Sequence, residues 1–254
     1  MRVIRSFVIA FATYSRIPMP RVAWSEENRK YAMCFFPLIG VVIGGALSLW
    51  LWLCDALALG PLLRGAVGAA IPLFITGGIH MDGFMDTSDA LASWQPKEKR
   101  LEILKDSRVG AFAALGCGAY LLLEAALISE VSVRQAVSMG LCFVLSRALS
   151  AWVLASFKGA RPDGMLDSFA RAARRRLVTV SSSLWAALCL VGWGLSGGVR
   201  LALLCAAAAV LSTLYYRHMA YKQFGGVTGD LAGWYSQMAE LLLIAAVLAG
   251  GKWL

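Results

Sequence analysis

The chain has 254 residues, of which 59% are hydrophobic and only 15% are charged, and its formal net charge is +9. Soluble domains carry about 25% charged residues, so this composition excludes a soluble globular protein and indicates a membrane protein. Because no soluble basic domain is present to hold nucleic acid, we interpret the positive charge as a topology signal and as attraction to the anionic lipid bilayer. Six scattered cysteines, with no Cys-x-x-Cys pair, support neither a disulfide framework nor a zinc site.

The first element is an amphipathic segment. Ile4, Phe7, Val8 and Phe11 fall on one side of a helix, which favours a helix lying in the membrane interface over a cleaved signal peptide. Seven apolar stretches follow, at residues 34–54, 65–81, 109–129, 135–157, 177–195, 199–216 and 231–250. Most reach the ~20 residues needed to cross hydrocarbon.

The second stretch contains Pro72, Gly77 and Gly78, which predict a broken or tilted helix. The fold class is therefore all-α. We expect a polytopic helical bundle with about seven transmembrane helices and an N-terminal interfacial helix, forming one domain over residues 1–254. In the first span, Gly40-x-x-x-Gly44 predicts a close helix contact.

The orientation follows from the basic residues. With the N-terminus in the cytoplasm, most of the 24 Lys and Arg residues fall in cytoplasmic segments, as the positive-inside rule requires. The segment after the second span, which is acidic, is then cytoplasmic.

That acidic segment carries Asp82, Asp86 and Asp89 at positions i, i+4 and i+7. On a helix the three carboxylates share one face. Clustered anions repel one another unless a cation neutralises them, which favours a divalent metal site. A solvated acidic loop is the alternative.

Other residues near the membrane surface could act on a substrate. His80 is either a general base or phosphate ligand, or a structural histidine beside the glycine break. Asp106 and Arg108 precede the third span, where Arg108 could bind a phosphate through paired hydrogen bonds, the alternative being a helix cap. The turn Gly225-Gly-Val-Thr228-Gly-Asp230 could offer backbone N–H groups to phosphate oxygens.

Charged residues also occur inside the spans. Arg147 and Glu240 lie at matching depths, ten residues from the cytoplasmic ends of their spans, so they could form an ion pair. Alternatively, Arg147 binds substrate. In the basic loop, Asp163 and Asp167 could form a second metal motif, but we favour a turn. Carboxylates and arginines together at a membrane surface suit transfer chemistry on a pyrophosphate-bearing substrate.

At these residues the chain resembles the cobalamin synthase family, the adenosylcobinamide-GDP ribazoletransferases. The resemblance is carried, in family order, by residues 11–20 (FATYSRIPMP), 36–40 (FPLIG), 77–89 (GGIHMDGFMDTSD), 106–112 (DSRVGAF), 146–147 (SR) and 225–230 (GGVTGD). The family often has Asp-Gly where Asp89-Ala90 stands here.

The resemblance implies the last assembly step of vitamin B12 synthesis at the cell inner membrane. A ribose hydroxyl of α-ribazole, or of its 5′-phosphate, would attack adenosylcobinamide-GDP and expel GMP with Mg²⁺ as cofactor. Assembly into a homo-oligomer is left open. The implied metal ligands are Asp82, Asp86 and Asp89, and the implied catalytic residues are His80 and Asp89. The implied substrate-binding residues are Arg16, Asp106, Arg108, Arg147, Thr228 and Asp230.

Two other classes of function fit parts of this pattern. One is another membrane transferase: a prenyltransferase using Asp82-x-x-x-Asp86 and Asp163-x-x-x-Asp167, or a CDP-alcohol phosphatidyltransferase. The other is a transporter with Arg147, Asp230 and Glu240 lining a path, although the clustering of acidic residues at one face disfavours it.

Overall fold

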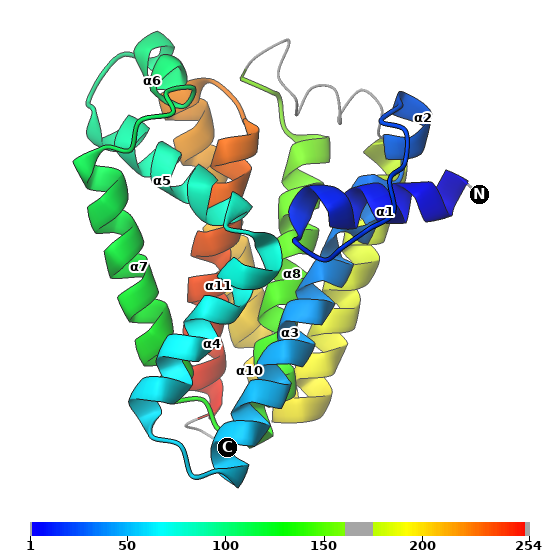
Figure 1. Ribbon diagram of the computed structural model, residues 1–254, viewed down its shortest axis with the longest axis vertical. Coiled ribbons are helices and arrows are strands. Elements are labelled where there is room, and N and C mark those ends of the chain that lie inside the picture. Colours follow the sequence, from blue (N-terminus) through cyan, green and yellow to red (C-terminus); the bar gives the residue numbers. More distant parts are fainter. Residues whose placement is uncertain (1, 161–174, 252–254) are drawn as a thin grey trace.

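The computed structural model describes residues 2–160 and 175–251, and this part of the chain is helical, without a β-strand. The elements are α1 (Arg2–Tyr14), α2 (Glu26–Arg29), α3 (Ala32–Ala56), α4 (Pro61–Thr76), α5 (Ile79–Ala92), α6 (Lys97–Ile103), α7 (Ala111–Ser129), the 3₁₀ turn η1 (Val133–Gln135), α8 (Ala136–Ser156), α10 (Arg175–Phe224) and α11 (Gly229–Gly251). The long helices run side by side, and α1, α2, α5 and α6 lie at one end of the bundle (Figure 1).

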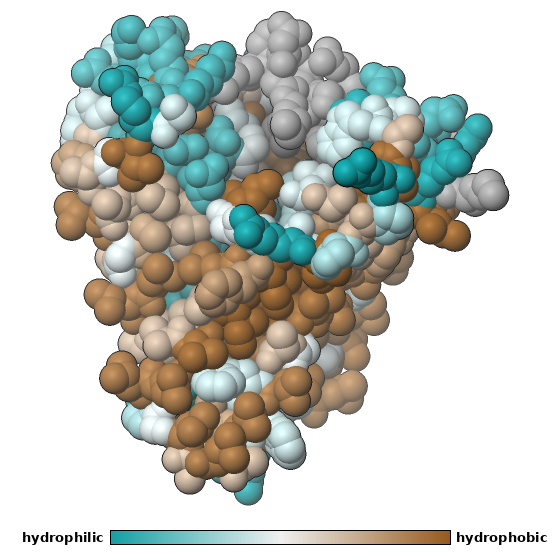
Figure 2. Space-filling view, viewed as in Figure 1, coloured by the Kyte–Doolittle hydropathy of each residue, from teal (hydrophilic) through white to brown (hydrophobic). Residues whose placement is uncertain are grey.

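Five helices of the described chain are long and apolar enough to cross a membrane, and the bent pair of α4 and α5 adds a sixth. The predicted all-helical, polytopic fold is confirmed. Hydrophobic residues cover much of the flank of the bundle, whereas hydrophilic residues gather at the end formed by α1, α2 and α6 (Figure 2). We call this end the polar end.

Helix α10 contains two of the predicted spans. Gly198 breaks it with non-helical dihedrals (φ 75°, ψ 174°). Ser196 is hydrogen-bonded to Ser138 near the start of α8, whereas Tyr221 accepts a hydrogen bond from the Lys158 N–H just beyond its end. The two arms of α10 therefore run in opposite directions. With each arm counted as one crossing, and α4 with α5 as one, the described chain traverses the bundle seven times, the number predicted.

The centre of the bundle is the contact between α3 and α8. A Cβ on Gly44 would stand 2.7 Å from the Gly140 Cα, and a Cβ on Gly40 would overlap the Phe143 carbonyl. The two backbones therefore approach as closely as small residues allow, which confirms the close contact predicted at Gly40 and Gly44.

The predicted second span ends earlier than expected, at Thr76 and not at residue 81. Gly77 and Gly78 adopt left-handed dihedrals (φ 67° and 79°), a region that glycine enters without steric cost. Consequently α5 leaves α4 at a bend of 99° and rises towards the polar end (Figure 1). The acidic segment thus begins a new helix.

Helix α1 lies across the bundle helices at the polar end (Figure 1). Val8 and Phe11 are buried on the protein, whereas Ile4 is 68% exposed and available to lipid. The Ser6 hydroxyl anchors the helix by donating to the Asn28 carbonyl (2.6 Å). This is the arrangement expected of an interfacial helix.

Candidate functional site

The acidic residues lie on α5 as the spacing predicts. Asp82 is exposed and Asp86 and Asp89 are half-buried, whereas Phe84 and Thr87 on the other side of the helix are buried. We call Asp82, Asp86 and Asp89 the carboxylate row.

Helix α11 brings a fourth carboxylate to this row. A Cβ on Gly83 would stand 2.7 Å from the Asp230 carbonyl oxygen, and a Cβ on Gly233 would stand 3.0 Å from the His80 carbonyl oxygen. Because two glycines face each other at this crossing, the start of α11 packs directly on α5. Asp86 consequently lies within electrostatic reach of Asp82, Asp230 and Asp89.

The residues fit a metal that is shared with a substrate. Neither Asp82 nor Asp86 makes an ion pair or side-chain hydrogen bond with another described residue. In the described chain no three His, Cys, Asp or Glu side chains gather into a closed metal cage. Mg²⁺ rarely uses such a cage, since it is commonly held by one or two carboxylates together with substrate phosphates.

A cavity of about 670 Å³ opens beside the row at the break between α4 and α5. Its lining residues are Arg16, Leu73, Phe74, Gly77, Gly78, Ile79, Met81, Asp82 and Met85. We call it the break pocket. The Arg16 N–H donates to the Ile75 carbonyl (2.8 Å), and the Arg16 side chain covers Gly77, where a Cβ would stand 2.7 Å from the Arg16 Cγ. The predicted substrate ligand Arg16 and the predicted metal ligand Asp82 thus share one cavity.

Asp89 makes contacts that the spacing did not reveal. One carboxylate oxygen accepts from the Gly110 N–H (2.6 Å) and the other from the Ala113 N–H (2.7 Å). Asp89 therefore caps the start of α7 and ties it to α5, a contact that the helix dipole also favours. Its predicted role as metal ligand or base stays a prediction, and the structure gives it a structural role.

His80 is not brought together with the carboxylates. It precedes Asp82 by two residues, or about 200° around the helix, and its side chain is buried (6% exposed) between the rings of Tyr14 and Phe36. Its Nε2 has no hydrogen-bond partner among residues 2–160 and 175–251. The structural histidine considered from the sequence describes this position better than a general base.

Asp106 and Arg108 form a local ion pair in the loop before α7. The Arg108 Nη2 donates to the Asp106 carboxylate (2.7 Å). This hydrogen bond lowers the pKa of the exposed Asp106 to about 2. Because the Arg108 side chain is also exposed, it can reach a phosphate only by exchanging this partner.

The predicted phosphate turn is largely occupied by protein contacts. The N–H groups of Gly225, Gly226 and Val227 donate to the carbonyls of Tyr221, Ala220 and Lys158. The Thr228 hydroxyl accepts from the Leu231 N–H and caps α11. Thr228 and Asp230 lie at the start of this helix, and the backbone of Asp230 packs against Gly83 beside the carboxylate row.

Lys97 of α6 lies beside the predicted phosphate turn, although it was not predicted from the sequence as a site residue. Its ammonium group occupies the space that a Cβ on Gly225 would need, and it forms no ion pair with another described residue. No short-range pattern connects residues 97 and 225, so only the folded chain reveals this cation next to the turn.

Arg147 is paired with Glu240 inside the bundle. The Arg147 Nη1 donates to the Glu240 Oε1, and both side chains are 0% exposed. The predicted ion pair is confirmed. Because the Arg147 side chain is fully buried, a substrate group that arrives from the aqueous phase does not contact it in this structure.

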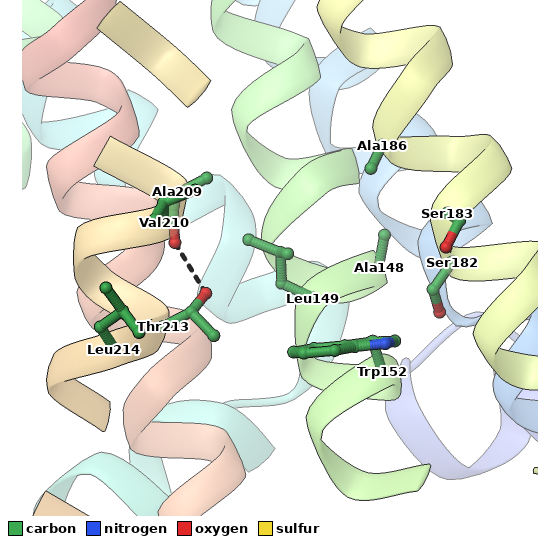
Figure 3. A pocket seen from close by; sticks show the side chains of 10 residues that line it. All are labelled: Ala148, Leu149, Trp152, Ser182, Ser183, Ala186, Ala209, Val210, Thr213 and Leu214. Atoms are coloured by element: carbon green, nitrogen blue, oxygen red, sulfur yellow. Dashed lines mark hydrogen bonds between the residues drawn. The ribbon is translucent and has the colours of Figure 1, made fainter. Parts of the chain in front are cut away.

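Two further features lie elsewhere. Asp163 and Asp167 fall outside the described residues. A second cavity of about 360 Å³ lies between α8 and the two arms of α10, with Trp152 facing Ser182 on one side and Thr213 on the other (Figure 3). It is lined mostly by apolar side chains within the spans, and none of its described lining residues is a carboxylate.

Segments far apart in the sequence converge at the polar end. Residues 77–89 form the break and α5, residues 225–230 lead into α11, and residues 106–112 begin α7, while Arg16 covers the break. A family model described as cobalamin-5-phosphate synthase matches residues 6–248. The chain belongs to this family.

Curated members of the cobalamin-5-phosphate synthase family match over nearly their whole length. An adenosylcobinamide-GDP ribazoletransferase from Lachnoclostridium phytofermentans is 42% identical over 252 residues, which cover 99% of this chain and 96% of the relative. Proteins of the same name from Leptothrix cholodnii and Ralstonia nicotianae are 34% and 32% identical, each covering at least 95% of both chains. No solved structure matches the chain.

Proposed function

We propose that the chain joins adenosylcobinamide-GDP to α-ribazole or its 5′-phosphate, releasing GMP and forming adenosylcobalamin or its 5′-phosphate. Membership of the cobalamin-5-phosphate synthase family supports a transferase of cobalamin assembly. The observation that carries the proposal is the pair of carboxylates Asp82 and Asp86, which have no ion-pair partner among the described residues and lie with Asp230 at the polar end of a membrane bundle.

The reaction is a displacement at phosphorus. A ribose hydroxyl of the acceptor forms a bond to the cobinamide-side phosphorus, the bond from that phosphorus to the bridging oxygen breaks, and GMP leaves with the bridging oxygen. The hydroxyl proton passes to solvent or to a carboxylate. Such transfers ask the protein mainly to position the reactants in line and to stabilise charge.

Asp82 and Asp86 are the residues that would hold Mg²⁺ together with the substrate, and Asp230 lies near them. A bound Mg²⁺ would supply positive charge to the diphosphate and to the departing GMP. Arg16, which lines the break pocket together with Asp82, supplies a cation beside the reacting phosphate. Lys97 and Arg108 are exposed cations available for the remaining phosphate oxygens.

The proposed location is the cell inner membrane, with the polar end in the cytoplasm. Both nucleotide-bearing compounds would then reach the site from the cytoplasm. The positive-inside rule supports this orientation, since basic residues concentrate in the segments at the polar end.

The alternatives fit the structure less well. A transporter path along Arg147 and Glu240 is disfavoured because these two side chains are fully buried and bonded to each other. A prenyltransferase would need a second aspartate motif facing the first; the candidate motif of Asp163 and Asp167 lies outside the described residues and so lends this alternative no support. A CDP-alcohol phosphatidyltransferase would need an Ala-Arg pair after Asp82-Gly83, where Phe84-Met85 stands.

The deciding experiment uses the purified protein in detergent with adenosylcobinamide-GDP, α-ribazole and Mg²⁺. We expect release of GMP together with a complete cobalamin, and loss of both with EDTA. Release of pyrophosphate from a prenyl donor, with no GMP from the corrinoid, would contradict the proposal.

A further inference from the structure

The break pocket has two chemically different parts. Its lining includes a cation and an anion, Arg16 and Asp82, and five apolar side chains, those of Leu73, Phe74, Ile79, Met81 and Met85. Phe74 is 76% exposed and Ile79 is 40% exposed. A ligand that fits this pocket therefore has one apolar end and one polar end.

The volume of the break pocket suits α-ribazole better than adenosylcobinamide-GDP, the other proposed substrate. The pocket volume of about 670 Å³ lies within the ~300–1,000 Å³ typical of pockets for drug-sized ligands. The corrin ring of adenosylcobinamide-GDP, fringed with amides and joined to GDP, is far larger and needs many hydrogen-bond partners. A nucleoside with a bicyclic aromatic base is the compact substrate.

The side chains of the wall suit an aromatic base. Met81 and Met85 are one helical turn apart on α5, and a methionine sulfur makes favourable contacts with aromatic rings. Phe74, across the break on α4, can offer its ring to the base. The ribose would then lie towards Asp82, where the proposed transfer takes place.

An acyl chain of a lipid is the main competing occupant, because the pocket lies beside the apolar flank. The opposite charges of Arg16 and Asp82 in the same cavity disfavour it, since an acyl chain would leave both charges unsolvated without a partner.

From these observations we infer that the break pocket binds the aromatic base of the acceptor α-ribazole, and that Phe74 and Met85 are residues that determine its specificity. This inference rests on the proposed function. It assigns the corrinoid substrate to the opposite side of the carboxylate row, towards Asp230 and Lys97.

The test measures equilibrium binding of α-ribazole to the purified protein in detergent, without the corrinoid, for Phe74→Ala and Met85→Ala. The matched control is Leu62→Ala, which removes an 87% exposed leucine of α4 that does not line the pocket. We expect each pocket variant to weaken binding roughly tenfold, as removal of an aromatic or sulfur contact does, and the control to bind as the unaltered protein does. In turnover, the KM for α-ribazole should rise while the KM for adenosylcobinamide-GDP stays within about twofold.

Other outcomes would overturn the inference. Unchanged α-ribazole binding in both pocket variants, with phospholipid lost from the purified Phe74→Ala protein, would identify a lipid groove. A raised KM for adenosylcobinamide-GDP alone would place the corrinoid in the pocket. If the unaltered protein binds α-ribazole but never releases GMP, the proposed reaction fails while the base pocket stands.

Discussion

Asp82 and Asp86 are the side chains on which the proposed chemistry depends. Replacing either by Asn removes a negative charge and keeps the shape, so we expect turnover to fall by roughly 100-fold or more, as when charge stabilisation of a transition state is lost. Thermal stability should hold or rise, because the variant relieves repulsion in the carboxylate row. Glu98→Gln, which removes an exposed carboxylate on α6, is the control for charge alone. Near-native rates for both Asn variants at saturating Mg²⁺ would rule out the metal assignment.

The pair of Arg147 and Glu240 gives a second prediction at this scale. Because both side chains are fully buried, Arg147→Ala or Glu240→Ala leaves an uncompensated charge, and we expect each to cost about 3 kcal/mol of stability. The double variant should recover much of the loss. Thermal unfolding in detergent gives the stability of the two single variants and of the double variant, which together form a double-mutant cycle. Strictly additive losses of stability would show that the two residues do not interact.

Single residues also show what the sequence can and cannot reveal. The shared face of Asp82 and Asp86 followed from helical periodicity alone, and the pairing of Arg147 with Glu240 followed from equal depth. The inward direction of His80 was available from the same periodicity, since two residues turn a helix by about 200°. Lys97 could not be found in this way, because its neighbour Gly225 is brought to it only by the packing of α6 against the end of α10.

Among the secondary-structure elements, α5 is the helix against which both α7 and α11 pack at the polar end. Asp89 joins it to α7 through two N–H groups, so Asp89→Ala should lower stability by about 1–2 kcal/mol, the usual cost of a lost N-cap. Asp89→Asn keeps one good acceptor oxygen and should lose less. Thermal unfolding and GMP release are measured together, with Ser88→Ala on the same helix as the control. If Asp89→Ala instead keeps full stability and loses turnover, Asp89 acts as a metal ligand or a general base.

The elements themselves were largely predictable, but two of their junctions were not. Apolar length located the spans, and glycine and proline located the break at Gly77 and Gly78. The bend of 99° depends on both glycines entering the left-handed region in succession, which composition does not specify. Likewise, the crossing of α5 and α11 depends on Gly83 meeting Asp230, a contact between segments almost 150 residues apart.

At the scale of the whole molecule, the bundle has a polar end and an opposite end. Each loop between two crossings lies at one of these ends, so the side of the membrane on which a loop lies can be tested. Ser93 follows α5 at the polar end, whereas Gly197 adjoins the break between the arms of α10 at the opposite end. A reporter enzyme that is active only outside the cytoplasm should therefore be silent when fused after Ser93 and active when fused after Gly197. Activity at Ser93 would put the carboxylate row on the side away from cytoplasmic nucleotides.

The hydrogen bond from the Arg16 N–H to the Ile75 carbonyl has a practical consequence for protein engineering. This bond links the segment after α1 to the last turn of α4. A displacement of α1 would therefore also move the residues that line the break pocket. Helix α1 lies at the polar end of the bundle, whereas α11 ends at the opposite end (Figure 1). A purification tag or fluorescent protein attached at the C-terminus leaves this linkage undisturbed, and an N-terminal fusion should reduce turnover even where the protein inserts and folds normally.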